Sequence, residues 1–106
     1  MREAAGRAPG RDAVIVGVLR VELRLTDARS LKDKRRIVQS LLDRARQEYH
    51  VAAAEVDRQE SWRQAALGFA CVSEAAEHAS RVLSRVVSLI QRETRVEVVD
   101  YAIEIL

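Results

Sequence analysis

The sequence is poor in cysteine, proline and aromatic residues, with one cysteine, one proline and 4% aromatics in 106 residues. A single cysteine cannot form an intramolecular disulfide bond, which excludes the small secreted domains that depend on several disulfides. Cys71 has the apolar neighbours Phe69 and Val72, which predict a buried thiol. We therefore expect a reducing compartment and a cytoplasmic protein.

Long apolar runs are also missing. The best candidate, residues 13–25, is interrupted by Arg20, Glu22 and Arg24, and it is shorter than the roughly 20 apolar residues that cross a bilayer. The sequence therefore predicts neither secretion nor membrane insertion.

Common catalytic and metal-binding patterns do not occur in the sequence. His50 and His78 are isolated, no serine or cysteine lies in a nucleophile motif, and there is no glycine-rich phosphate loop. We expect no catalytic residue, no metal ion and no small-molecule cofactor, and we do not predict an enzyme.

The composition predicts one folded domain. Hydrophobic residues make up 48% of the chain and charged residues 32%, which suits a globular protein of this length with one core. Residues 1–12 contain the proline, two glycines and three arginines without a periodic apolar face, so we interpret them as a flexible leader. Residues 13–106 form the predicted domain.

Apolar periodicity predicts six elements in the order β, α, β, β, α, β. Strands are expected at residues 13–25, 50–57, 64–73 and 95–105. One helix is expected at residues 31–49 with Ser30 as its N-cap, and a second from the N-cap Ser73 to about residue 92. Two right-handed crossovers then give an α+β fold, a ferredoxin-like βαββαβ sandwich with a four-stranded antiparallel sheet and both helices on one face. The first and last strands are neighbours in this arrangement, so Arg20 and Arg24 share an outward face with Asp100 and Glu104.

Several segments resemble the YlxP family of small bacterial proteins, a domain of unknown function (503). The resemblance covers roughly residues 14–106 and is carried by residues 16–23 (VGVLRVEL), 30–36 (SLKDKRR), 54–57 (AEVD), Trp62, 67–68 (LG) and 104–106 (EIL). It implies a ferredoxin-like fold and a bacterial cytoplasmic setting. Family genes often lie beside genes for translation factors, which implies RNA or ribosome biology, and no catalytic residue is transferred.

Positive charge is concentrated in one part of the chain, although the formal net charge is only +2. Residues 29–46 hold seven bases against two acids, whereas residues 47–106 hold six bases against ten acids. The molecule is therefore polarised, and such a field can steer a charged partner.

The first predicted helix presents these bases on one side. Lys32, Arg35, Arg36 and Arg46 follow spacings of three and four together with Gln39 and Asp43, opposite the core stripe, while Lys34 is expected to lay its aliphatic stem on that stripe. Such an array at a helix start suits phosphate oxygens. An ordinary solvated helix face is the alternative interpretation.

The outward face of the sheet is predicted to carry an apolar half. Alternation places three valines on the same face of the first strand as Arg20, namely Val14, Val16 and Val18. On the neighbouring last strand, Val98 and Ala102 are expected to extend this apolar surface. A second copy of the protein often covers a face of this kind, which would make a homodimer. The alternatives are that the leader folds over it, or that the register changes at Gly17 through a bulge.

Aromatic and acidic residues give weaker indications. Only Phe69 lies on a central strand and Tyr101 is interpreted as core, so base stacking on the sheet is not predicted. Glu55, Asp57 and Glu60 at a strand end, with Trp62 nearby, favour a solvated strand end and a packed loop over a metal or acid-base site.

Three functional hypotheses follow. The first is a non-catalytic binding module that contacts structured RNA or a ribosomal surface through Arg29, Lys32, Arg35, Arg36 and Arg46. The second is a homodimeric interaction module that uses Val14, Val16, Val18, Val98 and Ala102 on the open sheet face. The third is a small enzyme or ligand-binding domain around Glu55, Asp57 and Trp62.

Overall fold

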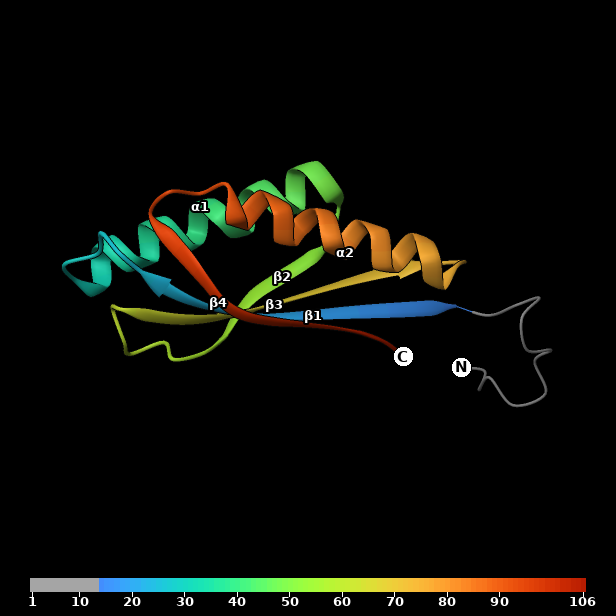
Figure 1. Cartoon of the computed structure of the whole chain (residues 1–106), viewed down its shortest axis with the longest axis horizontal. Helices are drawn as coiled ribbons and strands as arrows, with labels where there is room; N and C mark the ends of the chain where they lie inside the picture. Colours follow the sequence, from blue (N-terminus) through green and yellow to red (C-terminus); the bar gives the residue numbers. More distant parts are fainter. Residues whose placement is uncertain (1–13) are drawn as a thin grey trace, which may run out of the picture.

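A computed structural model describes residues 14–106, so the predicted leader lies outside the described residues. The elements are β1 (Ile15–Leu25), α1 (Leu31–Tyr49), β2 (Ala52–Asp57), β3 (Gln64–Ser73), α2 (Ala76–Gln91) and β4 (Val96–Ile105). All strand pairs are antiparallel, in the order β2-β3-β1-β4. Both helices cover one face of the sheet (Figure 1), which confirms the predicted ferredoxin-like α+β fold.

The core lies between the sheet and the two helices. Alternation in β1 turns Leu19, Val21 and Leu23 toward the helices, where Leu41 of α1 and Leu83 of α2 are also fully buried or nearly so. Gly17 belongs to the same inner face, because a Cβ built there would lie 2.9 Å from Leu83 Cδ1. The absence of a side chain at this position lets α2 pack closely on β1.

The only register shift between β1 and β4 lies at Glu22 and Leu23, and the pairing at Gly17 is regular. The predicted alternative of a bulge at Gly17 is therefore wrong. Glu22 pairs with Asp100 and Leu23 with Val98, so Val99 is the extra residue on β4. This bulge inverts the side-chain alternation of β4 at its midpoint.

The start of α2 also differs from the prediction. Ser73 does not cap the helix, because its Oγ accepts a hydrogen bond from the backbone N–H of Ala75, and α2 begins at Ala76 without a side-chain cap. Cys71 is buried as predicted, and burial raises the pKa of its thiol. Neither helix of the described chain is long and apolar enough to span a lipid bilayer.

Candidate nucleic-acid interface

The start of α1 is fixed by its own caps. Ser30 has an extended backbone, and its Oγ accepts a hydrogen bond from the N–H of Asp33 at 3.0 Å. The Asp33 carboxylate in turn accepts from the N–H of Arg29 at 3.1 Å. Because a carboxylate already occupies the positive end of the helix dipole, attraction of an anion to this region must come from the basic side chains.

Lys32, Arg35 and Arg36 are exposed on the side of α1 that faces away from the sheet. None of the three forms an ion pair or a side-chain hydrogen bond with another residue in the range 14–106. Their charges are therefore not neutralised by acids of the described chain, and they can bind external anions.

Arg46 lies on the predicted face but is committed to internal contacts. Its guanidinium pairs with Asp43 Oδ1 at 3.0 Å and donates to the carbonyl oxygen of Ala53 at 2.6 Å. Gln39 also donates to Asp43. Arg46 therefore ties α1 to β2, and its prediction as a phosphate ligand is weakened relative to Lys32, Arg35 and Arg36.

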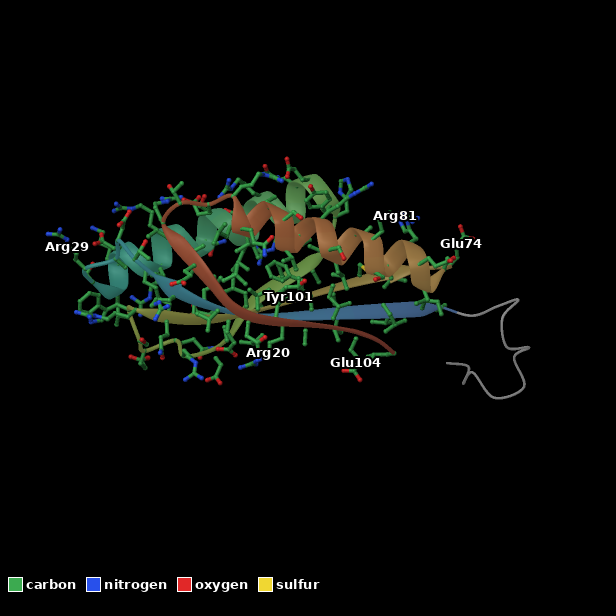
Figure 2. The ribbon with its side chains drawn as sticks, in the orientation of Figure 1. Arg20, Arg29, Glu74, Arg81, Tyr101 and Glu104 are labelled. Atoms are coloured by element: carbon green, nitrogen blue, oxygen red, sulfur yellow. The ribbon has the colours of Figure 1, made fainter. Side chains whose placement is uncertain are left out.

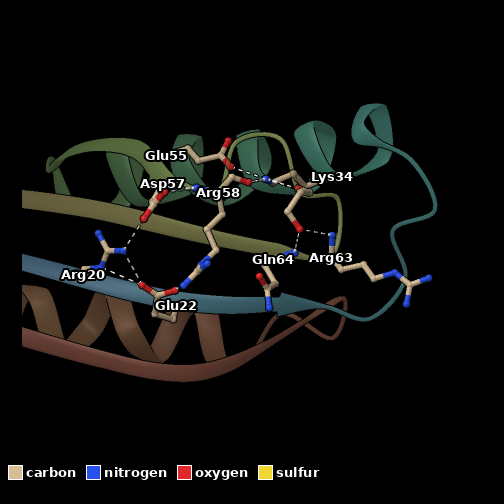
Figure 3. A network of polar contacts seen from close by, with 9 residues as sticks. Arg20, Glu22, Lys34, Glu55, Asp57, Arg58, Arg63 and Gln64 are labelled. Carbon is tan, nitrogen blue, oxygen red and sulfur yellow. Dashed lines mark hydrogen bonds and ion pairs between the residues drawn. The ribbon is translucent and has the colours of Figure 1, made fainter.

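Lys34 is completely buried, rather than resting its stem on the core with an exposed charge. Its Nζ lies 2.7 Å from Glu55 Oε2 and donates to the carbonyl oxygens of Arg58 at 2.7 Å and Ser61 at 2.6 Å. Glu55 Oε2 is buried too. Its contact with the Lys34 ammonium is an ion pair whose angles are not those of a regular hydrogen bond. Lys34 thereby holds the β2–β3 loop under the first turns of α1 (Figure 3).

The β2–β3 loop places one more base beside this end of α1. Arg63 and Arg29 line the same surface hollow of about 360 Å³ together with Trp62. The Arg63 guanidinium lies 4.6 Å from the centre of the Trp62 ring, a cation–π contact. Sequence reasoning missed Arg63, because the loop is brought to α1 by the buried Lys34 and by no local pattern.

The acidic cluster predicted at the end of β2 is divided between the two faces of the sheet. Glu55 points inward to Lys34, whereas Asp57 points outward to Arg20 and Arg58 (Figure 3). The N–H of Arg58 and the nearby guanidinium groups lower the pKa of Asp57. Within residues 14–106, no three His, Cys, Asp or Glu side chains are grouped to hold a metal ion.

The charged half of the outer sheet face is neutralised internally. Arg20 pairs with Glu22 at 2.8 Å and with Asp57 at 3.5 Å, and Arg58 reaches Glu22 at 3.3 Å. Arg24 pairs with Glu97 at 2.7 Å. These arginines therefore differ from those of α1, since each already has an acidic partner.

The apolar half of the outer face is exposed. Val14 is 59% exposed and Val72, which lies beside Val16 on β3, is 72% exposed. Val18 and Ala102 are also on this face, Val18 at the rim of a shallow hollow over the alanines of β2 and β3. No helix or loop of the described chain covers it (Figure 1).

Val98 is not part of this surface. It pairs with the buried Leu23 and packs against the core, because the bulge at Val99 shifts the alternation of β4. The predicted placement of Val98 on the outer face is therefore wrong. The same bulge leaves Val99 exposed.

Aromatic residues do not form a stacking platform on the described outer face. Phe69 is buried between the sheet and the helices, and Trp62 packs partly against the core. Tyr101 lies opposite Val21 on the inner side of β4 but is 47% exposed, because β4 is an edge strand. Its interpretation as a core residue is therefore wrong.

Glu93 joins the end of α2 to its neighbours. Its carboxylate contacts Arg95 at 2.7 Å and Arg44 of α1 at 2.8 Å. The hydrogen bond from the Arg95 side chain is the main reason that the pKa of Glu93 falls from 4.5 to about 2. Arg44 is thus not available to a ligand.

This lowered pKa predicts a pH dependence of stability. Since the folded state favours the ionised carboxylate, the contribution of Glu93 is complete above pH 4.5 and is lost as the pH falls toward about 2. Urea unfolding of wild type and Glu93→Gln should therefore show a difference in free energy that shrinks between pH 6 and pH 2. A difference that is constant over this range would contradict the assignment.

Three comparisons bear on this chain. The model of a protein family described as "Protein of unknown function (DUF503)" matches residues 16–103. The "Uncharacterized protein YlxP" of Bacillus subtilis (strain 168) is 29% identical over 83 residues, which are 78% of this chain and 90% of that protein. A solved structure, "De novo designed protein Foldit4", covers 89% of this chain and 97% of its own, with a TM-score of 0.50 and 14% identity. At that identity the likeness concerns the fold alone.

Proposed function

The chain belongs to the DUF503 family, whose function is unknown, and from this premise we propose that it is a non-catalytic module that binds structured RNA or a ribosomal surface. The observation that carries the proposal is the set of exposed bases Lys32, Arg35 and Arg36, which have no acidic partner within residues 14–106. Arg29 and Arg63 flank them at the start of α1.

The contrast between the two sides of the molecule supports this choice. Arginines on the outer sheet face meet acids at 2.7–3.5 Å. A polyanion that binds that face would have to displace these acids from the arginines. The α1 bases can bind a polyanion without breaking an ion pair of the described chain. Because phosphate contacts of this kind carry no base readout, the binding should be largely independent of sequence.

Sedimentation with ribosomal particles tests this proposal. We expect the protein to pellet with the particles at about 50 mM salt and to be released at about 200 mM, since bound phosphates exchange for counterions. Recovery in the supernatant at both salt concentrations, with the protein folded by circular dichroism, would refute the proposal.

A homodimer is the second candidate, favoured by the exposure of Val14 and Val72 on the uncovered outer face. The occupant we propose is a second copy of the chain. Light scattering should give a dimer mass at micromolar concentration, and Val72→Glu should return it to a monomer, because a buried unpaired charge is costly. A monomer mass for the wild type up to about 100 μM would eliminate this candidate.

A further inference from the structure

Helix α2 carries a second row of bases that sequence analysis did not single out. Arg81 and Arg85 lie within α2 and Arg92 caps its C-terminal end; they follow one another at spacings of four and seven, and all are exposed. Figure 2 shows Arg81 pointing away from the sheet. Ser84 and Ser88 fill the turns between the arginines, so the outward side of α2 from residue 78 onward has no acid.

The fold places this row beside α1. The two helices cover the same face of the sheet and run in opposite directions, because they follow the antiparallel strands β1 and β3 (Figure 1). The contact of Arg44 with Glu93 fixes the end of α2 against the C-terminal half of α1. The bases of α2 therefore continue the line of bases that begins at Lys32.

Acids of the helix layer do not interrupt this line. Glu93 is occupied by Arg44 and Arg95, and Asp43 by Arg46 and Gln39. The other exposed acids of the layer lie beyond the α2 arginines, at the end of the line farthest from Lys32. They are Glu48 in the last turn of α1, Glu74 just before α2 and Glu77 in its first turn, one turn before Arg81. No acid in the described chain forms an ion pair with Arg81, Arg85 or Arg92.

The length of the line limits the partner. Arg44, which is held by Glu93 and only marks where α2 meets α1, lies about 18 Å along α1 from Lys32, and Arg92 and Arg81 are about 17 Å apart along α2, at 1.5 Å per residue. The bases thus extend over about 30 Å, the length of roughly ten base pairs of a nucleic-acid double helix. A mononucleotide or a free phosphate would contact only a small part of this surface.

The scarcity of aromatic residues on the two helices favours a double-stranded over a single-stranded ligand. Proteins that bind single strands stack bases on aromatic side chains. The only aromatic residue of the two helices is Tyr49, which packs against the core. Double-stranded RNA is instead recognised through its shape and its phosphates.

We propose that α1 and α2 together form one phosphate-binding surface for double-helical RNA, with Arg81, Arg85 and Arg92 contributing about as much as Lys32, Arg35 and Arg36. This inference rests on the proposed function and names its ligand class. Binding occurs without base specificity, and single-stranded RNA of the same length binds more weakly.

Fluorescence anisotropy with a labelled 20-base-pair RNA duplex tests this inference. For R81Q/R85Q/R92Q we expect affinity to fall about tenfold or more near 0.1 M salt, and the log–log salt slope to become shallower by roughly 2 to 3. The control variant R20Q/R24Q/R58Q also removes three positive charges, but from arginines that form ion pairs on the opposite face. It should change affinity less than threefold. Circular dichroism checks that each variant is folded.

The outcomes separate the two proposals. If R81Q/R85Q/R92Q binds like the control while K32Q/R35Q/R36Q is weakened, the two-helix surface is refuted and the proposed function stands. If K32Q/R35Q/R36Q binds like the control, the proposed function fails. Tighter binding of a 20-nucleotide single strand than of the duplex would overturn the assignment to double-helical RNA.

Discussion

Replacing Lys34 with methionine is expected to destabilise the protein by about 3–5 kcal/mol, because it leaves the buried Glu55 carboxylate without its charge partner. Lys34 is 0% exposed and Glu55 only 17%. The carbonyl oxygens of Arg58 and Ser61 lose their ammonium donor at the same time. Methionine keeps most of the buried stem, so the loss reports the charge and the hydrogen bonds more than a cavity.

Two further variants show whether the pair is the cause. Lys32→Met lies two residues away on the exposed face of α1, and we expect it to change stability by less than about 0.5 kcal/mol. K34M/E55Q removes both charges and should be more stable than K34M alone. Denaturant unfolding checks all three variants, and a K34M loss below about 1 kcal/mol would contradict the anchoring of the β2–β3 loop by Lys34.

Neutralising the α1 bases in K32Q/R35Q/R36Q is expected to weaken RNA binding about 10- to 100-fold near 0.1 M salt while leaving stability unchanged. All three side chains are exposed and lack acidic partners within residues 14–106, so their loss breaks no described ion pair. Glutamine has nearly the helix propensity of lysine and arginine. Affinity should therefore fall without a change in the free energy of unfolding.

Anisotropy titration and denaturant unfolding of the same preparation check this prediction. R20Q/R24Q/R58Q provides the matched control, since its three arginines carry equal charge but already contact Glu22, Asp57 and Glu97. Equal weakening in both variants would mean that net charge alone governs binding. The α1 surface would then have no special role.

The order and type of the six elements were predictable from the sequence, because each strand or helix has its own apolar period. The alternation of Leu19, Val21 and Leu23 sets the buried face of β1, and the structure confirms it. The ends of the helices and strands were less predictable where a side chain could form a local hydrogen bond other than a helix cap. Ser73 was expected to cap α2, but its hydroxyl accepts from Ala75 in a turn that precedes the helix.

The bulge at Val99 was not predictable from alternation, since an extra residue in one strand leaves no mark in the sequence pattern. It placed Val98 against the core instead of on the outer face. Lys34 illustrates a second limit. A lysine within a basic run is expected at the surface, and only the approach of Glu55 and the β2–β3 loop makes its burial favourable.

The candidate interface was partly predictable. Helical spacing correctly placed Lys32, Arg35 and Arg36 on one exposed side of α1, whereas the commitment of Arg46 to Asp43 and Ala53 depends on contacts that spacing does not determine. Tertiary packing brings Arg63 to Arg29 just before α1, and it brings the α2 arginines beside α1. Regional charge counts concealed them, because residues 47–106 carry more acids than bases.

The salt dependence of wild-type binding to a 20-base-pair RNA duplex measures most directly whether the unpaired bases of α1 attract phosphate. Three or more phosphate contacts predict a log–log slope of about −3 or steeper between 50 and 200 mM salt. Absence of binding at 50 mM, or an affinity that does not change with salt, would contradict a phosphate-binding role for this surface.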